Sequence, residues 1–400
     1  MKKLLIPALL FCACAGLLLA GTGLAITATM PPYRDSIGGD NHTEKITGLY
    51  LIRASAAREN NLIIYGSSEL RTRDISTHPA NFFADERSGF QVNLVGRGSC
   101  QSLIHALSIA ASGGALTGQK VVLITSPQSY VPQGIAPDQF MANFSPQQYL
   151  ELLGADDLSD EVKQAISSRV AELIDAYEAL PDSTAVDPAL KYLAGHHSDP
   201  GLLSSARNMA LTPYYGVSRY LYDLRDKTSA RTLLLSAGPD AAYVPFPEGI
   251  DWESEAAAAG AEARRLATNN DFGMINDYYT TYIGSRLARY ENRDADLDYA
   301  QSKEYDDLRI LFEVCRQKGT RPLFIHVPLH GAWSDYTGFT VERRQQYYQH
   351  VRDIAESYDI AMLDLTGYEY EDYFLCDVMH LGWKGWLAVD KALIDYYNGL

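Results

Sequence analysis

Short apolar runs alternate with longer amphipathic stretches along most of the chain. The runs are rich in β-branched residues, and most of them lead into a turn. They span 61–65, 91–95, 121–125, 322–328 and 361–366. Helix-like patterns stand between several of them, for example at 103–113 and 341–358. Strand-like runs that alternate with helical patterns predict parallel strands joined by crossover helices. We therefore expect an α/β fold in which helices flank a parallel sheet in three layers.

The pattern between about 144 and 299 is different. Ser145 and Pro146 occupy the preferred cap and first-turn positions of a helix, and apolar residues recur at helical spacing from 159 to 180. The alanine-rich stretch 255–270 also favours a helix, whereas RTLLLS at 231–236 is strand-like. We expect this part of the chain to be a mostly helical insertion in the sheet domain.

The N-terminal segment 1–30 has the pattern of a membrane anchor. After Lys2 and Lys3, no charge occurs from Leu4 to Met30, which is longer than the roughly 20 apolar residues that span a bilayer. It is also longer than the apolar core of a signal peptide, so an uncleaved anchor is the preferred interpretation. Cleavage near Ala28 and lipidation at Cys14 are the alternatives.

The lysines predict which side of the membrane each part occupies. They place the N-terminus in the cytoplasm and the rest of the chain outside by the positive-inside rule. Residues 31–45 are polar and rich in turn formers, which predicts an exposed linker before an extracytoplasmic domain at 46–400. We expect a single-pass protein of the cell membrane whose main domain is extracellular.

Charge and cysteine content narrow the function classes. Acidic residues outnumber basic ones by 50 to 34, giving a net charge of -16, so a nucleic-acid partner is not expected. A local groove can still bind a polyanion, because binding depends on the local field. Outside the anchor only Cys100, Cys315 and Cys376 remain, which allows at most one disulfide and leaves its existence open.

The turn after the run 61–65 carries the first candidate chemistry. Gly66 permits a tight bend, and Ser67 or Ser68 beyond it can project a hydroxyl above the sheet edge. The alternative is that these serines only cap a helix. Glu69 either caps the same turn or binds a substrate amine.

A second candidate lies near the C-terminus, in CDVMHLGWKGW. A serine needs an imidazole to accept its proton, and that imidazole needs an acceptor to fix its tautomer. Asp377 and His380 are three residues apart, a spacing that places both side chains on one face of a helical turn. A capping histidine is the alternative interpretation of His380.

Two further positions follow strand-like runs and can stabilise an oxyanion. Gly96 allows a backbone N–H to approach a substrate closely, and Gln128 offers a side-chain amide. Each is also compatible with an ordinary loop. The pairs His326 with His330 and His196 with His197 lack the other ligands of a metal site, so we expect neither a metal nor another cofactor.

The order of these motifs resembles that of the SGNH, or GDSL-like, hydrolases. GSS stands where that family has Gly-Asp-Ser, which aligns Ser68 with the nucleophile, and Asp-x-x-His near the end aligns Asp377 and His380 with the rest of the triad. The resemblance implies an SGNH-hydrolase-like sheet. The family's Gly-x-Asn-Asp block is replaced by Ser126-Pro127-Gln128, so the role of Gln128 departs from the family pattern.

Several longer motifs resemble the DltD family of D-alanyl-lipoteichoic acid biosynthesis proteins of Gram-positive bacteria. They are YGSSEL, GRGSCQSLIHALSIAA, VVLITSPQSY, NNDFGMINDYY, HVPLHGAWSDYTG and DVMHLGWKGWL, within about 45–395. The resemblance implies D-alanyl transfer onto teichoic acid, together with the membrane-bound O-acyltransferase of the pathway. It also implies a polymer groove to which the block from 269 to 279 contributes, namely Asn269, Asn270, Asn276, Asp277, Tyr278 and Tyr279.

The resulting hypothesis is acyl transfer through a serine ester. Asp377 orients His380, His380 deprotonates Ser68, and Gly96 with Gln128 stabilises the oxyanion. The direction of transfer stays open. The rival functions are a noncatalytic scaffold that binds polymer or carrier for the O-acyltransferase, and an extracellular serine esterase or thioesterase.

Overall fold

The structure is a computed structural model of the 400-residue chain. It describes all residues except 1, 72–73, 85–88, 200, 241–248 and 400, and it describes residues 2–6, 8–9, 11–12 and 202–204 by their backbone alone.

A five-stranded parallel sheet forms the centre of the fold, as the sequence predicts. The strands are β1 (Asn61–Tyr65), β2 (Gln91–Val95), β3 (Lys120–Thr125), β4 (Arg321–His326) and β5 (Ala361–Asp364). Their order across the sheet is β2-β1-β3-β4-β5, and every neighbouring pair is parallel. β1 therefore lies between β2 and β3, so the turn after β1 has the ends of both neighbours beside it.

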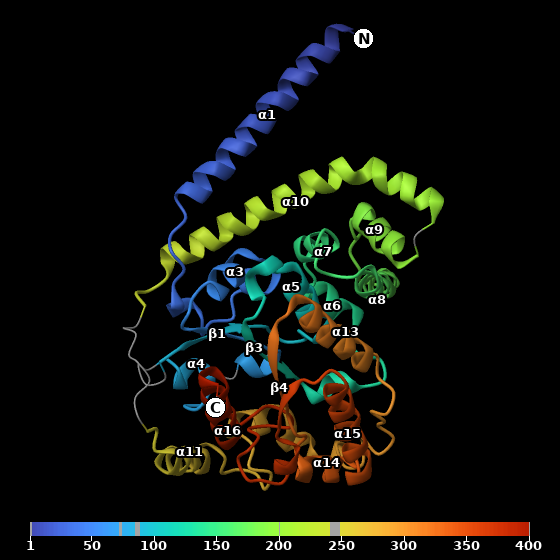
Figure 1. The fold of residues 1–400 in the computed structure, drawn as a ribbon. Coiled ribbons are helices and arrows are strands. Elements are labelled where there is room, and N and C mark those ends of the chain that lie inside the picture. Colours follow the sequence, from blue (N-terminus) through green and yellow to red (C-terminus); the bar gives the residue numbers. More distant parts are fainter. Residues whose placement is uncertain (1, 72–73, 85–88, 200, 241–248, 400) are drawn as a thin grey trace.

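Alternate residues of the strands bury themselves on opposite faces of the sheet. In β1, Ile63 and Tyr65 join one hydrophobic core, whereas Leu62 and Ile64 join the other. Each core contains its own helices, and Figure 1 shows α5 and α13 on one side of the sheet with α4, α11 and α16 on the other. The three-layer arrangement is thus present, because strands buried on both faces need cover on both faces.

The helices of the first face are α3 (Tyr50–Ala56), α5 (Ser102–Ala111), α13 (Lys303–Lys318) and α15 (Val341–Ser357). Those of the second face are α4 (Pro79–Phe82), α11 (Trp252–Leu266) and α16 (Trp383–Asn398). The short helices α2 (Thr43–Thr47), α12 (Asn276–Tyr278) and α14 (Gly331–Thr337) lie in connections.

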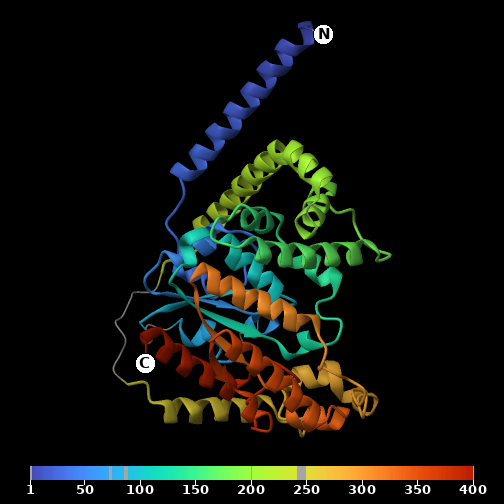
Figure 2. The same cartoon turned by 45° about the vertical axis from the view of Figure 1, so that its right-hand side comes forward.

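Most of the segment 144–299 is helical, as predicted. Its first helices, with α6 just before them, pack outside the first face: α6 (Pro137–Asn143), α7 (Pro146–Leu153), α8 (Asp160–Glu178), α9 (Pro188–Ser198) and α10 (Leu202–Ser236). The later helix α11 of the same segment packs on the second face. Ser145 caps α7 by accepting a hydrogen bond from the Gln148 amide. Figure 2 shows α10 as a long helix over this layer.

The predicted strand at 231–236 is wrong, because these residues form the last turns of α10. Ala230 and Leu234 lie four residues apart on one helical face and are buried against Tyr33, Ile37 and Leu51. A run of leucines fits a strand or a helix equally well until its packing partner is known.

The segment 31–45 differs from the expected exposed linker. Tyr33, Asp35 and Ile37 are buried, and the fully buried Lys45 ammonium donates to the Ile37 and Gly38 carbonyls at 3.1 and 2.7 Å. It also donates to the Asn93 side chain of β2 at 3.0 Å. The polar residues and glycines of this segment are therefore packed against the domain by specific hydrogen bonds. A polar, glycine-rich composition does not distinguish such a segment from an exposed linker.

The N-terminal helix α1 runs from Lys2 to Ala28 and extends from the rest of the molecule (Figure 1). Among the residues that the structure describes in full, no helix combines the length and apolarity of a membrane span. The membrane anchor therefore stays a prediction.

Candidate active site

The turn after β1 places two serines in different environments. Gly66 follows β1, and Ser68 begins a short 3-10 helix that runs to Arg71. Ser67 is buried, and its hydroxyl lies 3.4 Å from the Arg97 carbonyl, whereas Ser68 is half-buried. Only Ser68 is therefore placed to meet a partner above the sheet edge.

That partner is His380. The Ser68 Oγ lies 2.8 Å from His380 Nε2, and His380 Nδ1 lies 2.6 Å from Asp377 Oδ2. An ionised carboxylate can only accept a hydrogen bond, so Nδ1 of His380 carries the proton. Nε2 is then unprotonated and can accept a hydrogen bond from the Ser68 hydroxyl. The three side chains that sequence reasoning selected as nucleophile, base and orienting acid thus form one hydrogen-bonded chain.

The local backbone holds Asp377 and His380 together, but not as a helical turn. Asp377 Oδ1 accepts from the Met379 and His380 amides at 2.9 and 2.8 Å, so the side chain closes a bend before α16 begins at Trp383. The expected helical spacing is wrong at this point. An aspartate that bonds its own following backbone favours such a turn over a helix.

The electrostatics of this pair suit a base. Burial lowers the pKa of His380, but the Asp377 charge, the hydrogen bond to it and the Glu69 carboxylate outweigh burial and raise the pKa above its ordinary value. Burial raises the pKa of Asp377, yet His380 and two backbone amides outweigh it and hold the pKa below its usual range. Asp377 is therefore ionised at any pH at which His380 is unprotonated and can act as a base.

Gly96 lies directly against the serine turn. Its φ is +154°, and a Cβ placed there would lie 1.7 Å from the Gly66 carbonyl oxygen. No larger residue permits the ends of β1 and β2 to approach so closely. The candidate oxyanion glycine is thus adjacent to the candidate nucleophile's turn.

Gln128 has a different setting. Its side chain is exposed and lines a cavity of about 630 Å³ together with Ser99, Gln101 and Arg169. Within the described part of the chain, no hydrogen bond joins Gln128 to Ser68 or His380. The structure brings Gly96 to the serine turn but leaves Gln128 in the neighbouring cavity.

Glu69 lies beneath the turn rather than above it. Its carboxylate is buried and accepts the Ser67 amide at 2.6 Å through Oε1, and burial raises its pKa despite that bond. This geometry favours the capping role that was one of the two interpretations of Glu69.

The asparagines of the candidate polymer groove are occupied by their own loop. Asn276 Oδ1 accepts from the Thr268 and Asn269 amides at 2.7 and 3.1 Å, and Asn270 Oδ1 accepts from the Phe272 and Met274 amides at 3.1 and 3.0 Å. Asn269 donates to Thr280 at 3.0 Å. These side chains build the loop, and their outer faces remain exposed or half-buried.

This loop nevertheless lies against the Asp377 bend. The Ile275 amide donates to the Cys376 carbonyl at 2.8 Å, and Val378 packs with Met274 and Tyr278 in one apolar cluster. Burial, and next the Asp377 charge, raise the pKa of the half-buried Tyr278. Of the residues in the candidate groove, Tyr278 is thus the one with an electrostatic link to the triad.

His330 is a residue of this region whose role the sequence did not reveal. Its Nδ1 accepts from the Trp333 amide at 3.3 Å, and its Nε2 lies 2.9 Å from the Phe272 carbonyl. It therefore joins the start of α14 to the 269–279 loop.

The other histidines considered for a metal site lie apart from one another. His326 is buried at the end of β4, 3.9 Å from Asp364, and His196 is buried in α9. The described residues contain no group of three or more metal-binding side chains.

The described cysteines of the domain carry no disulfide. Cys100, Cys315 and Cys376 are buried free thiols, and burial raises the pKa of each. The bridge that the sequence left open is therefore absent among these three residues.

Comparison with known proteins identifies the family. The family model described as "DltD protein" matches residues 40–398. The chain belongs to the DltD family. The match spans Ser68, Asp377 and His380, so all three lie in the part of the chain that the DltD family shares.

Three curated relatives extend this finding. Protein DltD of Bacillus subtilis (strain 168) is 31% identical over 351 residues, which cover 88% of this chain and 86% of the relative. Protein DltD of Staphylococcus aureus (strain NCTC 8325 / PS 47) is 25% identical over 384 residues, 94% of this chain and 90% of the relative. Protein DltD of Lacticaseibacillus rhamnosus is 28% identical over 348 residues, 86% and 78% respectively. DltD proteins take part in the D-alanylation of teichoic acids.

Proposed function

We propose that this protein transfers D-alanyl groups onto teichoic acid through an ester on Ser68. The observation that carries the proposal is the hydrogen-bonded chain from Ser68 through His380 to Asp377, with lengths of 2.8 and 2.6 Å. A hydroxyl, an imidazole and a carboxylate in this order are the parts that nucleophilic acyl transfer requires.

In the first half of the reaction, His380 Nε2 takes the Ser68 proton while Oγ attacks the carbonyl carbon of a D-alanyl ester. The bond to the donor oxygen then breaks, and His380 returns the proton to that oxygen, leaving D-alanyl-Ser68. In the second half, a polymer hydroxyl gives its proton to His380 and attacks the new ester, and Ser68 leaves with the proton. The reverse reaction would use the same groups.

Negative charge on the tetrahedral oxygen needs donors near Ser68. The Ser68 amide and the Gly96 backbone are the proposed donors, since Gly96 contacts the serine turn. Gln128 is a further candidate, whose amide would have to turn from its cavity toward the substrate.

The acceptor polymer would approach from the side of the 269–279 loop. Tyr278 is the proposed contact because it is half-buried beside the Asp377 bend, and the exposed faces of Asn269, Asn270 and Asn276 extend from it. Glu69 would act through the turn that it caps rather than by touching substrate.

The proposed setting is the outer face of the cell membrane. The uncharged residues Leu4–Met30 behind Lys2 and Lys3 support α1 as a single-pass anchor with a cytoplasmic N-terminus. The D-alanyl donor would then come from the membrane-bound O-acyltransferase of the pathway.

Two measurements on the full-length protein test the proposal. A serine-reactive fluorophosphonate should label the wild type on Ser68. Intact mass spectrometry of the chain reconstituted with the O-acyltransferase and its D-alanyl source should detect a D-alanyl adduct on the same residue. A folded protein that gives neither adduct would contradict the covalent mechanism and favour the scaffold function. Labelling without any D-alanyl adduct would favour an esterase of another substrate.

A further inference from the structure

Exposed apolar side chains gather on two helices of this molecule. Ten of the fourteen large hydrophobic side chains that are exposed among the described residues belong to α1 and α10. On α10, Met209 is 76% exposed and Val217 is 57% exposed. Single exposed apolar residues are common on soluble surfaces, but a concentration on two helices marks an interaction surface.

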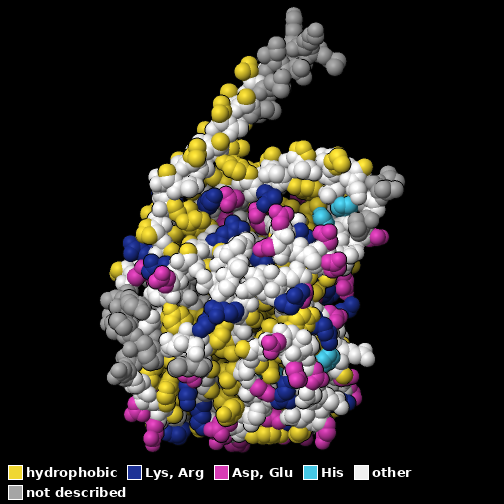
Figure 3. Space-filling model, viewed as in Figure 1, with side chains coloured by type: hydrophobic (Ala, Val, Ile, Leu, Met, Phe, Trp, Pro, Cys, Tyr) yellow, Lys and Arg dark blue, Asp and Glu magenta, His cyan; other side chains and the backbone are white. Residues whose placement is uncertain are grey.

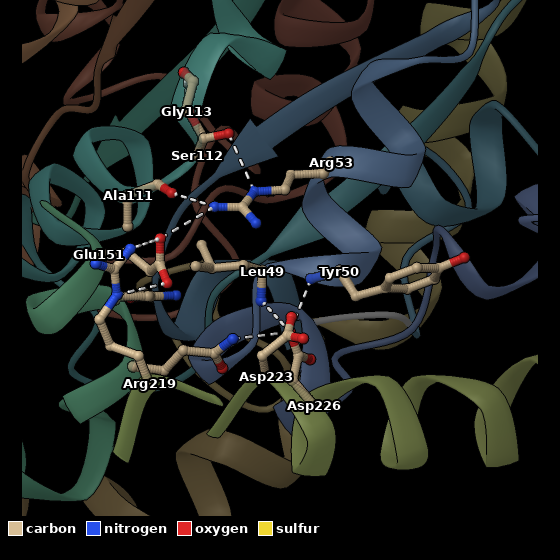
Figure 4. Close-up of polar contacts among 12 residues, drawn as sticks. Leu49, Tyr50, Arg53, Ala111, Ser112, Gly113, Glu151, Arg219, Asp223 and Asp226 are labelled. Atoms are coloured by element: carbon tan, nitrogen blue, oxygen red, sulfur yellow. Dashed lines mark hydrogen bonds and ion pairs between the residues drawn. The ribbon is translucent and has the colours of Figure 1, made fainter. Parts of the chain in front are cut away.

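Most of the exposed apolar residues of α10 lie along one side of the helix. Met209, Pro213, Val217 and Tyr220 follow each other at intervals of three or four residues and form a stripe, and the exposed Tyr214 and Leu221 lie on its flank. The opposite side packs on the domain, where Asp226 is buried and accepts the Leu49 and Tyr50 amides at 2.8 and 2.9 Å (Figure 4). The domain therefore fixes the direction in which the stripe faces.

α1 covers only one end of this stripe. The Tyr220 hydroxyl donates to the Leu19 carbonyl at 2.7 Å, and a Cβ on Gly23 would lie 2.5 Å from that hydroxyl. Beyond this contact the two helices diverge, as Figure 1 shows, and the stripe continues uncovered through Val217 to Met209. Figure 3 shows hydrophobic side chains along this side of the molecule, beneath the projecting α1.

The connection between α1 and the domain is short. α1 ends at Ala28, and Tyr33 is already buried in the small core that includes Ala230 and Leu234 of α10. Arg231 of α10 also donates to the Thr29 carbonyl at 3.2 Å. If α1 enters a bilayer, α10 must lie close to the plane of entry.

The charge of α10 opposes that of the whole chain. The helix contains five basic residues, Arg207, Arg219, Arg225, Lys227 and Arg231, and two acidic ones, Asp223 and Asp226, whereas the chain carries -16. Arg219 and Lys227 are paired with Glu151 and Asp223, whereas Arg207 and Arg225 are exposed. An apolar stripe combined with an excess of basic residues is typical of helices that lie in the interface of a membrane with anionic lipids.

We infer that α10 lies on the outer surface of the bilayer, with Met209, Pro213 and Val217 in contact with anionic lipids. This inference rests on the membrane anchor proposed for α1 and is independent of the chemistry proposed for Ser68. The domain is then held against the membrane at two places, α1 and α10, instead of being raised above it on a flexible linker.

Depth-dependent fluorescence quenching tests this placement. In the full chain, Cys12 and Cys14 are replaced by serine, and one new cysteine is introduced by Met209→Cys or Val217→Cys. This cysteine carries a polarity-sensitive fluorescent label. Cys100, Cys315 and Cys376 are kept, because they are buried and do not compete for the label. Ala257→Cys on α11 is the matched control, because it is exposed at the opposite end of the molecule (Figure 1). Vesicles contain phosphatidylglycerol, phosphatidylcholine and a shallow spin-labelled lipid.

We expect a blue shift and strong quenching at 209 and 217, and neither at 257. Val217→Asp should reduce the quenching at 209, whereas Ala257→Asp, on the distant helix α11, should leave it nearly unchanged. Unquenched labels on a chain that floats with the vesicles would overturn the inference while leaving the anchor intact. A chain that does not float would refute both. Shielding that arises only when the O-acyltransferase is added would also overturn it and assign the stripe to that protein.

Discussion

At the residue scale, two adjacent serines lie in the turn after β1, and of the two only Ser68 bonds a histidine. Ser68→Ala should abolish fluorophosphonate labelling and cellular D-alanine incorporation without loss of folded protein. Ser67→Ala is the matched control, because the hydrogen bond of its hydroxyl among the described residues is a long one, 3.4 Å to the Arg97 carbonyl. Normal incorporation by the folded Ser68→Ala protein would contradict the serine ester.

The pH dependence of the labelling rate reports on His380. The rate should rise with pH as His380 loses its proton, with a midpoint above the ordinary histidine pKa, since Asp377 and Glu69 raise it. Asp377→Asn should slow labelling by up to ~10⁴-fold and move the midpoint to lower pH, because the charge that raises the pKa is gone. Asp372→Asn, an exposed carboxylate of the same segment, is the control. An unchanged midpoint in Asp377→Asn would refute this electrostatic account.

Sequence reasoning selected Ser68, Asp377 and His380 because their residue types and chain order carry a recognisable chemistry. It could not assign Glu69 or the asparagines of the 269–279 loop, since carboxylates and amides bond a substrate and a backbone amide equally well. Which one they bond depends on the turn around them, as the bond from the Ser67 amide to Glu69 illustrates.

At the scale of elements, the approach of β2 to β1 depends on a glycine. Gly96→Ala should lower the free energy of unfolding by about 1–3 kcal/mol and reduce the labelling of Ser68, because the new Cβ collides with the Gly66 carbonyl in a backbone conformation with positive φ. Gly98→Ala is the matched control, since a Cβ there meets nothing within 4 Å. Urea denaturation and the labelling rate measure both effects, and equal behaviour of the two variants would contradict the close approach.

Asp226 links α10 to the start of α3. Asp226→Ala should lower the free energy of unfolding by about 1–3 kcal/mol. The reason is that the Leu49 and Tyr50 amides and the Gln147 side chain lose their acceptor inside the protein (Figure 4). Asp223→Ala removes a partly exposed ion pair with Lys227 and should lower the free energy of unfolding by less than about 1 kcal/mol. Chemical denaturation compares the two, and a similar loss in both would show that α10 is not held by this contact.

All five strands and the helical character of 144–299 follow from the hydrophobic pattern, because burial on two faces leaves a strong signal. The misassigned stretch 231–236 and the buried segment 31–45 share a cause. The two segments pack against each other in one small core, which contains Tyr33 and Ile37 together with Ala230 and Leu234. These residues are about two hundred positions apart in the chain. No local pattern records such a partner.

At the scale of the whole molecule, Lys45 joins the N-terminal segment to the sheet. Lys45→Met keeps the apolar stem but removes the donors to Ile37, Gly38 and Asn93. Hydrogen exchange and proteolysis within 31–45 should become faster, because three acceptors lose an internal partner. Lys303→Met, at an exposed lysine, should leave both rates nearly unchanged. Equal protection in the two variants would mean that this segment is held by other contacts.

The triad joins opposite ends of the chain, since Ser68 lies in its first fifth and His380 just before the last helix, α16. During synthesis the nucleophile is complete long before its base, and the turn that carries Ser68 cannot act until the final segment has docked on the sheet. A truncated or partly folded chain therefore holds an inert serine. Reaction of Ser68 with a fluorophosphonate thus serves as a probe of complete folding, applicable to any variant of this protein that retains the triad.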